Sequence, residues 1–209
     1  MVAASLGKNA IAQLLLDRGA SIHDMERDIG STTIIVAAEH GHSDMVDLLL
    51  RNGTSANDAT DWGRTSLVYA IMARCPEIAK RLIANGADIC RVDYCGWHVL
   101  CWACRHGQID VVRRLLDLAA ASPINPKKVA QDKDGWTSLS RAICNNQFAC
   151  MQELLSDPDI DLALHDNEGD TALSLATRSN FVFFMLQILG TEAYFFDDPV
   201  SHETFLAIS

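Results

Sequence analysis

The sequence predicts an all-α protein, a solenoid of stacked helix-turn-helix units with short hairpin-like loops. Two observations carry this prediction. A short apolar motif returns at intervals near 33 residues, and a Gly stands two residues before each copy. The copies begin at Thr32, Thr65, His98, Thr137 and Thr171. Self-similarity at such a period is typical of supersecondary units that bury their apolar faces only by stacking on one another.

The unit at 93–131 shows how one copy folds. Gly96 marks a turn, because Gly adopts the positive φ that a hairpin tip needs. A short helix is expected from His98 onward, and it ends at Gly107 because Gly stops helices. Apolar side chains then recur on one face of a second helix, at Ile109, Val111, Val112, Leu115 and Leu116.

The same pattern divides the whole chain, 1–209, into one array. Residues 1–26 are expected to form a partial repeat that begins inside a first helix, since Ala3-Ala4 aligns with Ala37-Ala38. Full repeats follow at 27–59, 60–92, 93–131 and 132–165. The third of these carries a loop insertion, because Leu100 and Leu139 are 39 residues apart instead of 33. A degenerate repeat at 166–198 and a partial repeat or C-terminal cap at 199–209 follow.

Charge and cysteine content limit the classes of function. A formal charge of −10 without a basic face argues against nucleic-acid binding, which needs clustered Lys and Arg. There is no apolar run long enough for a membrane span. Lys8 follows the first apolar stretch instead of preceding it, so no signal peptide is expected. Seven cysteines, an odd number, favour reduced thiols and a cytoplasmic or nuclear location.

The motifs resemble those of the ankyrin repeat family, and the resemblance covers essentially the whole chain. The family's unit begins D-x-x-G-x-T-P-L-H-x-A-A-x-x-G-H and ends with L-L-x-x-G-A-D. The runs that match are Gly30 to His42, Met45 to Gly53 and Ile83 to Asp88. The resemblance implies helix pairs joined by hairpin loops and, as function, non-catalytic protein–protein recognition, in the manner of a scaffold.

The chain departs from the family in the contacts that tie units together. Pro never follows the motif Thr, and the family's His is replaced by Ile35, Val68, Cys101, Ser140 and Ser174. In the family, that Thr–His pair supplies hydrogen bonds between neighbouring units. We therefore expect apolar packing to replace part of this network.

The resemblance also implies where a partner binds. In the family, hairpin tips and the exposed positions of the inner helices form a concave groove. Transferred residue by residue, the partner-binding positions include Glu39, His40, Trp62, Arg64, Met72, Tyr94, Trp97, Arg105, His106 and Trp136. Large aromatic side chains flanked by Arg dominate interface hot spots. The alternative for each Trp is that it packs against the next hairpin and only stiffens the groove.

The expected partner is a peptide or domain that brings an apolar anchor and a basic flank. Over the groove positions of all five units, acidic residues outnumber basic ones: Asp28, Glu39, Asp61, Asp134, Glu168 and Asp170 against Arg64, Arg105, Lys133 and Arg178. Self-association is also possible, because apolar residues stand at both unfinished ends. These residues include Val2, Leu14 and Leu15, and Phe205 and Leu206.

Catalysis or small-molecule binding in the same groove is the alternative function. Glu39, His40 and His106 could act as acid–base groups, with Arg64 and Arg105 holding an anion. The sequence has no Gly-rich phosphate loop, nucleophile elbow or closed metal motif, so we favour a protein that is not an enzyme and needs no cofactor.

A zinc site is the sharpest metal hypothesis, because Cys95, His98, Cys101 and Cys104 recur every three residues. Residues at that spacing drift around a helix axis, which makes tetrahedral closure difficult. Cys104 occupies a position that the family fills with a buried Ala, so a core cysteine is favoured over a metal ligand or a redox pair with Cys101.

Overall fold

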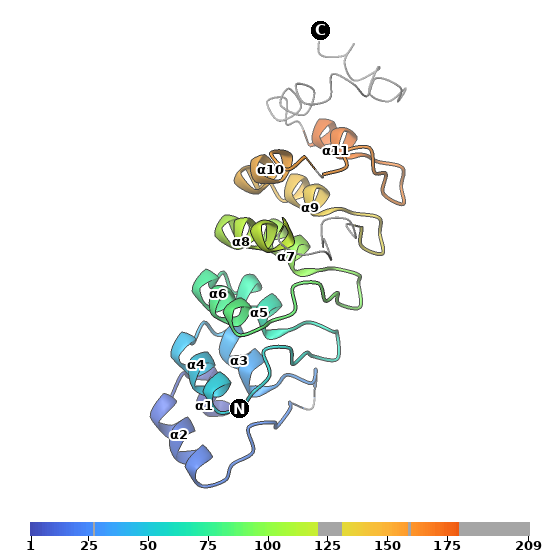
Figure 1. The fold of residues 1–209 in the computed structure, drawn as a ribbon. Helices are drawn as coiled ribbons and strands as arrows, with labels where there is room; N and C mark the ends of the chain where they lie inside the picture. The colour runs from blue at the N-terminus through green and yellow to red at the C-terminus, as the bar shows by residue number, and fades with distance from the viewer. Residues whose placement is uncertain (27, 121–130, 159, 180–209) are drawn as a thin grey trace, which may run out of the picture.

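The computed structural model describes residues 1–26, 28–120, 131–158 and 160–179, and in them it confirms the all-α stack (Figure 1). The helices are α1 (Val2–Ser5), α2 (Asn9–Asp17), α3 (Thr33–Glu39), α4 (Ser43–Arg51), α5 (Ser66–Met72), α6 (Pro76–Ala84), α7 (Val99–Arg105), α8 (Ile109–Ala120), α9 (Ser138–Cys144), α10 (Phe148–Leu155) and α11 (Ala172–Arg178).

The helices stack in two columns. The inner helices α3, α5, α7, α9 and α11 contact one another in that order, and the outer helices α2, α4, α6, α8 and α10 do the same. Hairpin loops project from the inner column on one side of the stack (Figure 1). The core follows the repeat, because the third residue of each motif (Ile34, Leu67, Leu100, Leu139 and Leu173) is apolar and buried.

The inner helices α3, α5, α7 and α9 each end in a turn that has the left-handed backbone conformation. Gly41 and Gly107 supply it with φ values of 75° and 66°. Two other units use a residue with a side chain, Arg74 (φ 55°) and Asn146 (φ 58°). Asn tolerates this region, whereas an Arg there is uncommon.

Backbone hydrogen bonds join each hairpin tip to the next. The N–H of Asp61 donates to the Ile29 carbonyl, that of Tyr94 to Trp62, and that of Asn167 to Asp134, each at 3.0 Å. The N–H of Lys133 donates to the Cys95 carbonyl at 3.2 Å. The tips therefore form a continuous edge whose side chains have fixed spacing.

The ties between helices vary along the stack. Thr32 and Thr65 have buried Oγ1 atoms with no partner among the described residues, as expected where Ile35 and Val68 replace the family's His. Thr137 instead accepts from the N–H of Ser140 at 3.1 Å, and Thr171 accepts from that of Ser174 at 3.2 Å. The bonds of Thr137 and Thr171 lie within their own units, where they cap α9 and α11, so they do not replace the family's hydrogen bonds between units.

Some expectations lie outside the described residues. These are the inserted segment at 121–130, the end of the degenerate repeat beyond residue 179, and the whole of 199–209. Among the helices that the structure describes, none is long and apolar enough to cross a membrane.

Candidate partner-binding surface

An aspartate at the base of the hairpin fixes its conformation in three successive units. One carboxylate oxygen of Asp93 accepts from the N–H groups of Cys95 and Trp97, both at 2.9 Å. Asp132 and Asp166 accept the equivalent bonds in their own hairpins at 2.8–3.0 Å. Since two charge-assisted bonds close each turn, the hairpin is rigid and its outer side chains are held in place.

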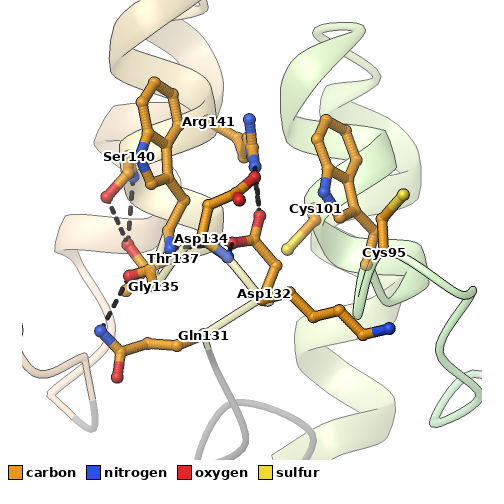
Figure 2. A network of polar contacts seen from close by, with 12 residues as sticks. Cys95, Cys101, Gln131, Asp132, Asp134, Gly135, Thr137, Ser140 and Arg141 are labelled. Carbon is orange, nitrogen blue, oxygen red and sulfur yellow. Dashed lines mark hydrogen bonds and ion pairs between the residues drawn. The ribbon is translucent and has the colours of Figure 1, made fainter. Parts of the chain in front are cut away.

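The second carboxylate oxygen of two of these aspartates holds a cation or an indole. Asp93 Oδ2 accepts from Trp102 Nε1 at 3.2 Å and pairs with Arg64 Nε at 3.5 Å. Asp132 Oδ2 accepts from Arg141 Nε at 3.1 Å and from a second guanidinium nitrogen of the same residue. Figure 2 shows Arg141 lying over Asp132, with Asp134 beside it.

These contacts belong to a stack of cations and rings that we call the Arg–Trp ladder: Arg64, Trp102, Trp97, Arg141 and Trp136. The Arg64 guanidinium lies 4.7 Å from the Trp102 ring, whose centroid is 4.6 Å from that of Trp97. Arg141 lies between the Trp97 and Trp136 rings, at 3.9 and 4.4 Å. Each cation–π contact contributes about 0.5–2 kcal/mol, so the ladder ties three units together.

The ladder separates the expected aromatic contacts into two kinds. Trp97 is only 9% exposed, because Trp102 and Arg141 cover it, so the expectation that its indole is available to a partner does not hold. Trp136 is half-buried. Trp62 and Tyr94 remain 55% and 65% exposed on adjacent hairpin tips. Those two rings are the most exposed of the expected aromatic side chains.

The remaining expected residues are either half-buried or exposed. Arg64 and Met72 are half-buried, the first held by Asp93 and the second packed on the core. Arg105 is exposed, with its guanidinium 5.4 Å from the Trp97 ring.

The His106 ring stacks on Trp102 at 6.0 Å. Glu39 and His40 are exposed two units away from His106, and His40 Nδ1 lies 2.9 Å from the Val36 carbonyl.

The acid–base set proposed for catalysis is therefore not assembled. Glu39 and His40 are separated from His106 by the unit at 60–92. Burial lowers the pKa of His106, and the charges of Arg105 and Arg74 lower it further. A cavity of about 300 Å³ lies elsewhere, beside Gly7, Gly41, His42 and Asp44.

Two of the cysteines near the ladder, Cys101 and Cys104, are core residues, whereas Cys95 is exposed. Cys104 is fully buried, as expected, and so is Cys101. Burial raises the pKa of Cys101 to about 11 and that of Cys104 well above its usual range, which keeps both thiols protonated. Within the described ranges no group of three or more His, Cys, Asp or Glu side chains could hold a metal ion.

His98, which replaces the motif Thr, gives a pH-dependent prediction. Burial lowers its pKa to about 4, and the carboxylate of Asp132 opposes only part of this effect. Below pH 6.5 the unfolded chain binds a proton that the fold excludes until about pH 4. The free energy of unfolding should therefore fall by up to about 3 kcal/mol as pH drops through this window.

Urea unfolding of the wild type and of His98→Thr, at pH 7 and pH 4.5, measures how much of the free energy of unfolding is lost on acidification because of His98. The variant restores the Thr of the other four units and should lose less stability on acidification than the wild type. Parallel losses in both proteins would contradict the assignment.

Two residues of the ladder, Trp102 and Arg141, were not expected from the sequence. Each stands four positions after its motif residue, where the other units have Val36, Tyr69 and Leu175. A comparison of that one position across units would have shown the exchange of apolar residues for a Trp and an Arg. The Asp of the family's D-x-x-G, present as Asp93 and Asp132, was the second available signal.

The known families and proteins to which this chain is similar share this repeat architecture. A family model described as ankyrin repeats (3 copies) matches residues 1–93 and 90–164. The ankyrin repeat domain-containing protein SAT10 of Stachybotrys chartarum is 29% identical over 154 residues, which are 73% of this chain and 7% of that protein.

The human SH3 and multiple ankyrin repeat domains protein 2 is 28% identical over 155 residues, 74% of this chain and 8% of its own length. The ankyrin repeat protein nuc-2 of Neurospora crassa is 29% identical over 192 residues, covering 76% and 18%. The chain thus spans less than a fifth of the length of each of these three relatives.

One solved structure, of the predatory endopeptidase Bd0816 from Bdellovibrio bacteriovorus in complex with the immunity protein Bd3460, contains a chain of the same fold. The TM-score is 0.75 at 21% identity, over 91% of this chain and 95% of that chain.

Proposed function

Because the chain belongs to the ankyrin repeat family, we propose that it recognises a protein partner through its hairpin tips and inner-helix ends. Repeats of this family are generally protein–protein interaction modules, and its members are generally non-catalytic. We call this the contact surface: Glu39, His40, Trp62, Arg64, Met72, Tyr94, Arg105, His106 and Trp136. The proposed partner is a protein segment, and neither a nucleic acid nor a membrane is proposed as a partner.

The exposure of Trp62 and Tyr94 is the observation that carries this proposal. Exposing these large aromatic side chains to water, at 55% and 65% exposure, costs free energy that binding a partner would recover. The N–H of Tyr94 donates to the Trp62 carbonyl at 3.0 Å, so the two tips are locked side by side. A partner would meet a preorganised aromatic pair, which reduces the entropy lost on binding.

The charges around this pair favour a segment with an apolar anchor and a basic flank. Asp28, Glu39 and Asp61 are exposed at the hairpin tips and helix end of the first two full units. Arg64, the nearest cation of the contact surface, is already paired with Asp93. A Lys or Arg beside the anchor would gain mainly in encounter rate and specificity.

Affinity capture from native cell extract tests the proposal. The protein and its Phe148→Ala variant, changed at an exposed aromatic residue of the outer column, should retain the same partner. Trp62→Ala with Tyr94→Ala should lose it while helical content and cooperative melting are unchanged. Equal capture by all three proteins would refute the proposed surface.

Self-association is a second proposal, supported by a specific observation on α2. Ile11 and Leu15 are 53% and 48% exposed, although they occupy the positions of Met45 and Leu49, which are buried in the next unit. Sedimentation velocity over a range of concentrations tests it, and a monomer throughout would contradict it.

A cytoplasmic or nuclear location is also proposed, from the seven free thiols, and cell fractionation tests it.

A further inference from the structure

Most arginines of the inner column have a carboxylate partner. Arg64 pairs with Asp93, Arg141 with Asp132, and Arg178 with Asp170. In the part of the chain that the structure describes, no carboxylate pairs with Arg74 or Arg105. These two guanidinium groups keep their hydrogen-bond donors available.

The repeat provides an internal reference for Arg105. Arg178 stands at the equivalent position, seven residues after its motif residue, and donates to both oxygens of Asp170 at 2.7 and 2.5 Å. The residue equivalent to Asp170 in the unit at 93–131 is Trp97. The position therefore suits a carboxylate, but in this unit the chain supplies a ring instead.

Trp97 holds Arg105 without satisfying its donors. The guanidinium lies 5.4 Å from the ring, a cation–π contact that leaves the N–H groups of Arg105 free to donate. A guanidinium stacked on a ring is also preorganised for a planar, two-pronged contact with a carboxylate.

Arg74 adds a second charge at the same end of the inner helices. It adopts φ 55°, a conformation that the equivalent turns give to Gly41, Gly107 and Asn146. The Arg74 side chain is exposed, and among the residues that the structure describes no carboxylate pairs with it, so its charge is accessible to a partner. The pKa of His106 is lowered by Arg105 and by Arg74, in addition to burial, so both charges lie within electrostatic range of that ring.

We propose that Arg105 and Arg74 form a subsite for an acidic side chain, Asp or Glu, of the segment that occupies the contact surface; this rests on the proposed function. The contact surface is then polarised. Its hairpin tips present Asp28 and Asp61 beside the aromatic pair, and its inner-helix ends present two free guanidinium groups. A bound segment places a basic residue toward the tips and an acidic residue toward the helix ends.

Selection of a phage-displayed dodecapeptide library on the full chain tests this subsite. Peptides whose binding requires Trp62 and Tyr94 should share an acidic residue. Changing that residue to its amide should weaken binding to the wild type at least about tenfold. The same change should have little effect on binding to Arg74→Gly with Arg105→Gln.

Two matched variants keep the test interpretable. Arg74→Gly introduces the residue that Gly41 and Gly107 supply in two of the equivalent turns, so it should not impair folding. Arg114→Gln removes the same charge from an exposed position on α8, and it should behave as the wild type does.

The outcomes separate the subsite from the function. Peptides that need Trp62 and Tyr94 but carry no acidic residue, or that bind the arginine variant equally well, overturn the subsite and leave the proposed function standing. Selection that yields no peptide dependent on Trp62 and Tyr94 counts against both.

Discussion

Replacing Asp132 by Asn is expected to lower the free energy of unfolding by about 3 kcal/mol, because Arg141 would remain buried without its carboxylate. The side chains of Asp132 and Arg141 are 0% and 9% exposed. The Asn oxygen can still accept the two hairpin N–H groups, so the loss falls on the ion pair. Asp134, 3.6 Å from Arg141 but 74% exposed, is too solvated to replace Asp132.

Asp166→Asn is the matched control for this prediction. Asp166 accepts the same two hairpin bonds, and no cation pairs with it within the described residues. Its replacement should cost about 1 kcal/mol or less. Urea unfolding followed by circular dichroism measures both variants, and equal losses would mean that the buried ion pair contributes nothing beyond the hairpin bonds.

Gly135→Ala is expected to destabilise the protein by about 3 kcal/mol, through backbone strain and a collision between hairpins. Gly135 has φ 81°, and a Cβ there would lie 2.8 Å from the Asn167 nitrogen and the Asp166 Cα. Both atoms are backbone, so the next hairpin would have to move as a whole.

Gly53→Ala separates the two causes. Gly53 has φ 88° but no atom within 4 Å of the added carbon, so it should show only the strain, about 1 kcal/mol. Urea unfolding of both variants gives the comparison. Similar losses at the two positions would show that the hairpin tips are not closely packed.

The repeat pattern predicted where the helices lie, because the apolar period marks them and Gly stands at several of their ends, although the breaks at Arg74 and Asn146 carry no Gly. The expected break at Gly107 separates α7 (Val99–Arg105) from α8 (Ile109–Ala120). His98 lies just before α7 as its N-cap, as the motif Thr does in the other units.

The orientation of the tryptophans was not predicted, although the sequence distinguishes them. Trp62 precedes the hairpin Gly, whereas Trp97 and Trp136 follow it. The N–H of the residue after that Gly donates to the hairpin Asp, and its side chain joins the Arg–Trp ladder. Family contact positions treat both places alike, so Trp97 was expected to face a partner when it is buried.

The ladder itself could not be derived from one unit. Its contacts join residues of three units, and each depends on how far one hairpin is displaced from the next. Trp102 donates to Asp93 and Arg141 donates to Asp132, and these bonds hold the two side chains in the ladder. Periodicity fixes which units are neighbours, and it does not specify which side chains fill the space between them.

We propose that Trp62 and Tyr94 contact a partner, whereas Trp97 stabilises the contacts between units. Measuring both partner affinity and urea unfolding for Trp62→Ala with Tyr94→Ala, and separately for Trp97→Ala, tests it most directly. The tip variant should lose at least about 100-fold in affinity with stability nearly unchanged. Trp97→Ala should lose about 3 kcal/mol of stability, and its affinity should fall by no more than about tenfold, the part that Arg105 contributes. The reverse pattern, with affinity lost at Trp97 and kept at the tips, would contradict the account.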